Sequence, residues 1–411
     1  MSPPPTPSTW AALRALPRIT HWLLLGMAGA RVASFMIWPF IAVAMNKRFG
    51  TPITEIGAQL AIGALVTIAL SPLSGWLGDR FDARNLMLAG CALCMGGYAL
   101  MGLLPSQSSY FVAIVVFAVA QSILEPLLRM LLSDTASSDA QRTFLFHIRY
   151  YLINCAAAIG PLLGLWFANC ASDAVFAVAV CANLGLALVI ANATRGRHAR
   201  AAKVVSPPLA TVFRALLGSK LLLTVIVMNF FLVLLYAQID EPLTFYLLQL
   251  QVQDINHLIA MMSVTNAAVV LAVHLLLMPR LIALADKTAY LAALACMMVA
   301  HGIIAANVHA WWFGWLLAVM FATFAEIVVM PLFGTLVDRL APPGMRGSFI
   351  GISMLAGLGS ALSPWLGALA IAKVGGVGWF SLLAIACVPI GVLGYRALQG
   401  SQPQALAEPA P

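Results

Sequence analysis

The sequence predicts an all-α integral membrane protein, with twelve transmembrane helices in two six-helix, pseudo-symmetric bundles. Hydrophobic residues make up 62% of its 411 residues and charged residues only 9%, whereas soluble globular proteins carry roughly 25% charged residues. Twelve apolar runs are long enough to span a bilayer, and several motifs recur at a spacing near 204 residues. These three observations define the expected architecture.

Each apolar run has about the twenty residues that a transmembrane helix needs. The first is too long for the apolar core of a secretory signal, and no small-residue cleavage site follows a short apolar core. The expected spans are 20–45, 54–78, 85–104, 110–133, 143–168, 174–193, 221–248, 256–282, 288–306, 311–337, 347–371 and 378–397.

One long polar break, at 194–220, separates six spans from six. It predicts a division into two bundles joined by a cytoplasmic loop. The expected parts are an N-terminal tail (1–19), an N-terminal bundle (20–193), a central loop (194–220), a C-terminal bundle (221–397) and a C-terminal tail (398–411).

Lysine and arginine set the expected orientation. With the N-terminus inside, the inner segments hold 16 of the 22 basic residues, the outer loops three, and three lie within spans. Because basic residues favour cytoplasmic loops, we expect a multi-pass protein of the inner (plasma) membrane with both termini in the cytoplasm. The same distribution accounts for the net charge of +8, so we expect no nucleic-acid partner.

The two halves of the chain repeat each other. Pro39 and Pro242 lie 203 residues apart, and the segment 160–164 (GPLLG) matches 363–367 (SPWLG) at the same offset. Six helices per half, an even number, give both copies the same orientation in the membrane. Parallel repeats of this kind characterise the major facilitator fold, whose halves rock around a site near the membrane midplane.

The segment 75–84 (GWLGDRFDAR), after the second span, resembles the inner-loop hallmark of the major facilitator superfamily. It departs from that motif at Asp82, where glycine is usual, and at Ala83, where a basic residue is usual. The resemblance implies a charge latch, with the aspartate near the start of the eleventh helix, whose N-terminus favours an anion. Ordinary marking of the cytoplasmic side is the alternative. The expected latch residues are Gly75, Asp79, Arg80, Arg84 and Arg346.

The fifth span carries Gly160, Pro161 and Gly164. This pattern is similar to a motif of the superfamily's proton antiporters, and the stretch 125–164 resembles that of bacterial multidrug-resistance efflux carriers. Small residues allow helices to approach closely, and proline bends a helix against its neighbours. Ala156 stands where the motif has glycine. Because glycine and proline are both common in membrane helices, ordinary helix packing is the alternative.

Charged side chains inside the spans indicate where the chemistry lies. An unpaired charge at the bilayer centre costs about 3 kcal/mol, so each normally faces a partner or a wet cavity. The resemblance implies that helices 1, 4, 7 and 10 line the central cavity, and six of the seven charges fall on them. The seven are Arg31, Glu125, Arg129, Arg149, Asp240, Glu241 and Glu326.

Three of these charges are expected to bind substrate or to pair structurally. Arg31, alone on the first helix, stays ionised and is expected to contact substrate. Glu125 lies four residues before Arg129, so the two side chains share a helix face and pairing is the alternative to substrate contact. Arg149 either serves substrate or pairs structurally, with Glu125 or with helix-end carbonyls.

The carboxyl groups of the second half are expected to carry protons or contact substrate. Glu326 has no charged residue within four positions, and burial in an apolar environment favours the neutral form of a carboxyl, as a proton carrier requires. Asp240 and Glu241 are adjacent and cannot share one helix face. At least one of them is expected to function.

Enzymatic chemistry is not expected. The sequence contains no phosphate-binding loop and no recognisable nucleophile arrangement, and Cys91-x2-Cys94 lies among apolar residues without a second pair. We therefore expect no metal and no cofactor.

The predicted function is secondary active transport by alternating access. We expect proton-coupled export of a small organic molecule, either a drug-like compound or an anionic or zwitterionic metabolite such as a siderophore. The alternatives are proton-coupled import of a small metabolite, or a non-transporting membrane sensor or enzyme on the same scaffold. The expected partners are the substrate, protons and the lipid bilayer, and we expect a monomer.

Overall fold

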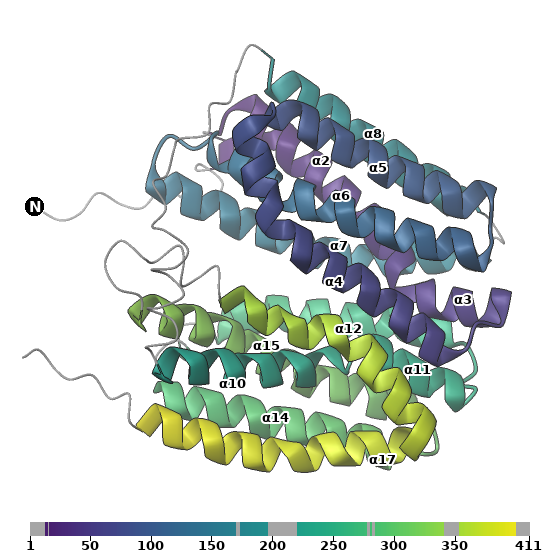
Figure 1. Ribbon diagram of the computed structural model, residues 1–411. Helices are drawn as coiled ribbons and strands as arrows, with labels where there is room; N and C mark the ends of the chain where they lie inside the picture. The colour runs from purple at the N-terminus through teal and green to yellow at the C-terminus, as the bar shows by residue number, and fades with distance from the viewer. Residues whose placement is uncertain are drawn as a thin grey trace, which may run out of the picture. The chain divides into compact units, whose positions relative to one another are not determined.

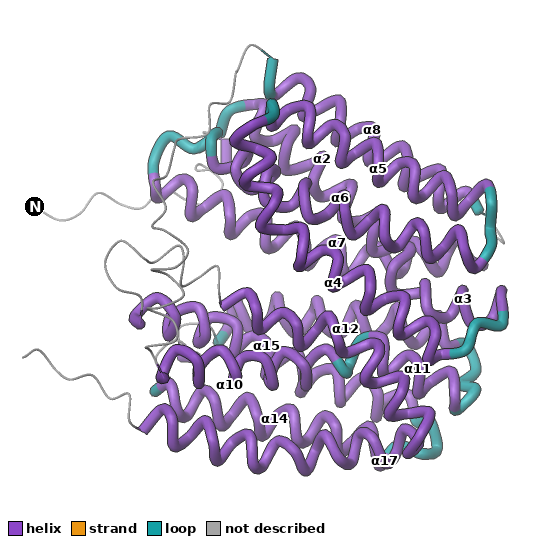
Figure 2. Tube along the Cα trace, viewed as in Figure 1, coloured by secondary structure: helices purple, strands orange, loops and turns teal. Residues whose placement is uncertain are grey.

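The computed structural model describes residues 13–14, 16–169, 173–195, 220–277, 280–281, 284–340 and 353–399. Its regular structure in these ranges is helical, without a strand (Figure 2). Within these ranges, eleven stretches are long and apolar enough to cross a membrane. The last, Leu355–Leu398, holds two spans, because Gly375 interrupts the helix with φ 74° and ψ 162°. This backbone conformation is accessible essentially to glycine alone. Counting the last stretch as two spans gives the twelve helices that the sequence predicts.

The chain divides into two compact units. Unit 1 comprises Met1–Ile37 with Ala69–Ala201, and unit 2 comprises Trp38–Ile68 with Ala202–Pro411. Most of the expected central loop, 194–220, lies outside the described residues, so the bundle boundaries remain a prediction.

Unit 1 is a bundle in which α2 packs against α7 and α8, while α5 packs against α6 and α8 (Figure 1). Polar caps begin two of these helices: the side chains of Asp82 and Ser106 accept hydrogen bonds from the N–H groups of Arg84 and Ser109. The helices are α2 (Arg18–Ile37), the end of α4 (Ile53–Arg80), α5 (Ala83–Leu103), α6 (Gln107–Ser133), α7 (Asp139–Asn169) and α8 (Ala174–Ala193).

Unit 2 repeats this packing. Its α10 packs on α17 as α2 packs on α7, and α14 packs on α15 and α17 as α5 packs on α6 and α8 (Figure 1). The sequence repeat is therefore also a repeat of helix contacts. The elements are η1 (Trp38–Phe40), α3 (Ile41–Phe49), the start of α4, α10 (Lys220–Ala237), α11 (Glu241–Gln249), α12 (Ile255–Leu276), α14 (Asp286–Ala306), α15 (Trp312–Leu340), η2 (Met354–Gly357) and α17 (Leu358–Gln399).

Two spans expected to be continuous are broken. The first breaks at η1, which contains Pro39, and the seventh breaks between α10 and α11, just before Pro242. Proline has no backbone N–H and fits the first turn of a new helix better than the interior of an existing one. Gln238, in the second break, is buried; its Nε2 donates to Ser363 Oγ, and its Oε1 accepts from Trp379 Nε1, both at 2.9 Å.

Gly160 allows α7 to lie directly on α2. A Cβ atom at this position would be 2.5 Å from the Cβ of Phe35 and 2.9 Å from the carbonyl oxygen of Val32. Gly359 on α17 allows a similar approach to α10, because a Cβ atom there would be 2.5 Å from the carbonyl oxygen of Phe230.

We expect Gly160→Ala to destabilise the protein by about 1–3 kcal/mol, the usual cost of overpacking a close contact. Thermal unfolding in detergent measures the effect. Gly185→Ala on α8 is the matched control, because a Cβ there would meet nothing within 4 Å. Equal melting temperatures for the two variants would contradict the proposed close contact.

Candidate functional site: two charged clusters

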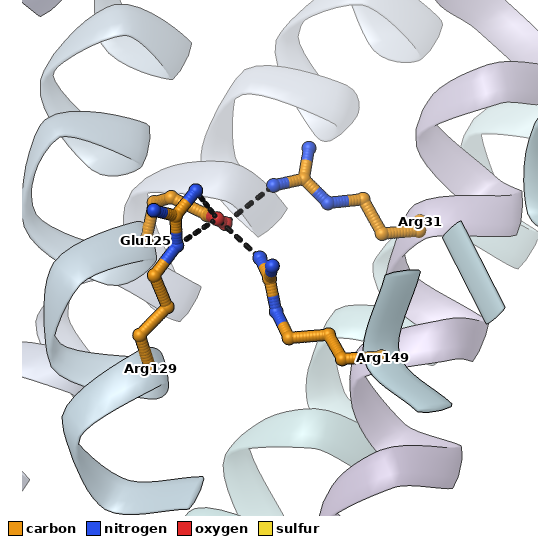
Figure 3. Close-up of polar contacts among 4 residues, drawn as sticks. All are labelled: Arg31, Glu125, Arg129 and Arg149. Carbon is orange, nitrogen blue, oxygen red and sulfur yellow. Dashed lines mark hydrogen bonds and ion pairs between the residues drawn. The ribbon is translucent and has the colours of Figure 1, made fainter. Parts of the chain in front are cut away.

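Three arginines converge on one carboxylate in unit 1 (Figure 3). Nη2 of Arg31 on α2 lies 2.5 Å from Oε2 of Glu125 on α6. Nε and Nη2 of Arg129, one turn further along α6, both lie 2.8 Å from Glu125 Oε1. Nη2 of Arg149 on α7 contacts the same oxygen. These four residues form what we call the arginine cluster. Glu125 makes both of the ion pairs that the sequence analysis named as alternatives to substrate contact, with Arg129 and with Arg149.

The arginine cluster holds more positive than negative charge. Three guanidinium groups face one carboxylate, which leaves two positive charges uncompensated within the cluster. The side chains of Arg149 and Glu125 are 12% and 24% exposed, those of Arg31 and Arg129 31% and 53%. The buried Nε of Arg149 has no hydrogen-bond acceptor among the described residues. The cluster therefore retains both charge and donor groups for an additional anion.

A small cavity adjoins the arginine cluster within unit 1. Arg31, Glu125 and Arg149 line it together with polar side chains that include Gln121 and Asn183. Its volume is about 40 Å³, enough for one or a few water molecules but well below the roughly 300–1,000 Å³ of typical ligand pockets. The cavity therefore has room for water beside the charges but not for an organic molecule of ordinary ligand size.

Unit 2 contains a cluster of opposite character. Asp240 and Glu241 lie at the break between α10 and α11, and Glu326 lies on α15. Asp240 is exposed, whereas the other two are half-buried. Asp240 is close enough to Glu241 and Glu326 for their charges to interact. No lysine or arginine of the described chain pairs with any of the three, which we call the carboxyl cluster.

Polar side chains surround Glu326. Tyr236 on α10 and Asn266 on α12 hydrogen-bond to its carboxyl group, and Asn266 Nδ2 also lies 2.9 Å from Thr323 Oγ1. Sequence reasoning missed Tyr236 and Asn266; their only signal was a polar atom within an apolar run. Among the described residues, no three histidine, cysteine, aspartate or glutamate side chains are placed to hold a metal ion.

The remaining predicted site residues are only partly described. Arg84 is in the first turn of α5, and the Gly75–Arg80 segment is helical at the end of α4, although its side chains lie outside the description. Arg346 also lies outside the described residues. Gly160, Pro161 and Gly164 are all within α7. The latch and the antiporter role of α7 therefore stay predictions.

Charged side chains inside apolar membrane-spanning helices are typical of membrane transport proteins. The sequence profile of the Major Facilitator Superfamily matches residues 23–357, which is most of the chain. The chain belongs to this superfamily of transporters.

Curated relatives span nearly the whole chain. An uncharacterized MFS-type transporter, YqjV, from Bacillus subtilis is 25% identical and covers 86% of each chain. The multidrug resistance protein MdtH of Aeromonas hydrophila is 24% identical over 92% of this chain and 94% of its own. A Na(+), Li(+), K(+)/H(+) antiporter of Planococcus maritimus is 22% identical over 84% of this chain and 89% of its own.

Solved structures share the fold. A POT family transporter crystallised in complex with 5-aminolevulinic acid superposes with a TM-score of 0.77, covering 94% of this chain and 97% of its own. Its sequence identity is 13%, so the likeness extends to the fold alone.

Proposed function

We propose that this transporter exports a small anionic or zwitterionic organic molecule in exchange for protons, by alternating access. The observation that carries the proposal is the arginine cluster. Guanidinium groups match carboxylate and phosphate geometry and remain charged at all physiological pH values. A net positive, partly shielded cluster inside apolar helices attracts the anionic group of a substrate and repels a purely cationic one.

The carboxyl cluster supports the proton half of the exchange. Three carboxyl groups without a basic partner repel one another when ionised, and binding a proton relieves that repulsion. Glu326, with Tyr236 and Asn266 beside it, has hydrogen-bond partners for either protonation state. We assign proton binding to Glu326, or to Glu241, and protonation from outside then favours release of the substrate.

The direction of transport rests on two further observations. Gly160, Pro161 and Gly164 match the antiporter-like pattern on α7, and relatives include proteins named as a multidrug resistance protein and as a cation/proton antiporter. Both favour export over import.

The proposal also includes the remaining predictions from the sequence. The latch around Asp79 controls the balance of inward and outward states. The protein has two six-helix domains, has both termini in the cytoplasm, and is a monomer.

Transport in inside-out membrane vesicles tests this function. With the vesicle interior acidified, we expect accumulation of radiolabelled anionic or zwitterionic compounds from a panel that includes siderophores, with simultaneous loss of internal acid. An uncoupler should abolish the accumulation. Accumulation of the same compounds only in right-side-out vesicles would indicate import, and transport of cationic drugs alone would contradict the role assigned to the arginine cluster.

A further inference from the structure

An apolar groove runs between α14 and α17 in unit 2, the two helices that lie side by side in Figure 1. Its walls carry side chains that are exposed although they lie within membrane spans, including Leu291 and Met298 on α14 and Val388 and Val392 on α17. The groove has a volume of about 490 Å³, within the range of small-molecule sites. None of the residues that line it belongs to either charged cluster.

The groove exists because its floor has no side chain at Gly391. A Cβ atom there would meet Leu294 Cδ1 at 3.5 Å and Leu291 Cδ2 at 3.7 Å, which are ordinary contacts. One turn away the helices touch directly, since Tyr290 packs against Gly394 and its hydroxyl donates to the carbonyl oxygen of Ile390 at 3.0 Å. The backbone therefore tolerates a Cβ atom at Gly391, and a longer side chain there is expected to occupy the groove.

The groove has one polar end, formed by Tyr395 and Arg396 where α17 finishes. Arg396 is exposed and makes no ion pair with any residue that the structure describes. Aromatic and basic side chains at the end of a span are typical of the level of lipid headgroups. Positive-inside topology predicts that this end is cytoplasmic.

The length of the groove matches one leaflet of the membrane. From Cys387 to Arg396, α17 rises by about 13 Å at 1.5 Å per residue, close to half of the roughly 30 Å hydrocarbon thickness. An apolar groove one leaflet deep, ending at a cation that pairs with no described residue, is complementary to an acyl chain attached to an anionic headgroup. We propose that this groove binds one anionic phospholipid, with its headgroup at Arg396 and an acyl chain along Gly391.

Native mass spectrometry of the full-length protein, extracted from liposomes of equal phosphatidylglycerol and phosphatidylcholine, tests the site. We expect the wild type to retain phosphatidylglycerol about fivefold over phosphatidylcholine, the preference expected for one basic side chain at an anionic surface. Arg396→Gln should lose the preference, and Gly391→Leu should retain neither lipid. Arg280→Gln, which removes an exposed cation outside the groove, and Gly302→Leu, which adds the same bulk where nothing lies within 4 Å, should both behave as wild type.

Three results would overturn the proposal. The first is equal retention of the two lipids by the wild type. The second is an unchanged preference in Arg396→Gln. The third is a wild-type dimer that Gly391→Leu dissociates, which would make the groove an interface between two copies of the chain.

Discussion

Replacing Glu326 by glutamine is expected to abolish substrate-driven proton flux in proteoliposomes, down to the level of protein-free liposomes. The amide keeps the shape of the side chain but cannot bind the transported proton. Its neighbours Tyr236 and Asn266 can still hydrogen-bond to it, so the fold and substrate binding should survive. Exchange of labelled for unlabelled substrate across the membrane, which needs no proton, should therefore continue.

The matched control is Glu55→Gln, the same chemical change at an exposed position in the first turn of α4. It should leave proton flux as in the wild type. The variants Glu241→Gln and Asp240→Asn show which residue of the carboxyl cluster carries the proton. Wild-type coupling in Glu326→Gln combined with its loss in Glu241→Gln would move the carrier to Glu241, and wild-type coupling in all three variants would eliminate the cluster.

The fold was predictable because the bilayer simplifies the physics. Every backbone polar group in a span must be satisfied within a helix, so run length alone locates the spans. The break at η1 was not predictable from run length, because apolar side chains continue across it. The second break coincides with the polar residues Gln238, Asp240 and Glu241, which the sequence analysis placed inside one continuous span. Pro39 and Pro242 were a local signal at both breaks. What holds the second break is tertiary, because Gln238 hydrogen-bonds to Ser363 and Trp379, more than a hundred residues away.

The charged residues of the site were identifiable for the same reason, since an ionised side chain in a span is costly enough to need an explanation. Their grouping was only partly visible. The spacing of Glu125 and Arg129 suggested their ion pair, but the contact of Arg31 with Glu125 joins residues 94 positions apart. Sequence spacing carries no information about which faces of two helices meet, so Tyr236 and Asn266 were missed for the same reason.

Replacing Glu125 by glutamine is expected to destabilise unit 1 and to strengthen its attraction for anions. The change leaves three guanidinium groups without a counter-charge. Removing one partner of a fully buried ion pair costs about 3–5 kcal/mol. Arg31 and Arg129 are only partly buried, at 31% and 53% exposed, so we expect a smaller loss of about 2 kcal/mol, measured as a lower melting temperature in detergent.

Second substitutions show which arginine causes the loss. Arg149 is the most shielded, at 12% exposed, and Arg129 the least, at 53%. Glu125→Gln with Arg149→Met should therefore recover much of the stability, because the double variant removes the most costly unpaired charge. Glu125→Gln with Arg129→Gln should recover little. Equal recovery in both double variants would show that solvent screens the three guanidinium groups alike.

The same variant links stability to the proposed substrate. A ligand that binds only the folded state raises its stability by mass action, so an added carboxylate anion should stabilise Glu125→Gln more than the wild type, in which Glu125 already occupies the guanidinium groups. Asp286→Asn, which breaks the exposed pair with Arg339, is the control and should gain nothing. If Glu125→Gln has the same melting temperature as the wild type, and added anions do not raise it, the arginine cluster holds no available positive charge. The proposal of an anionic substrate then loses its main support.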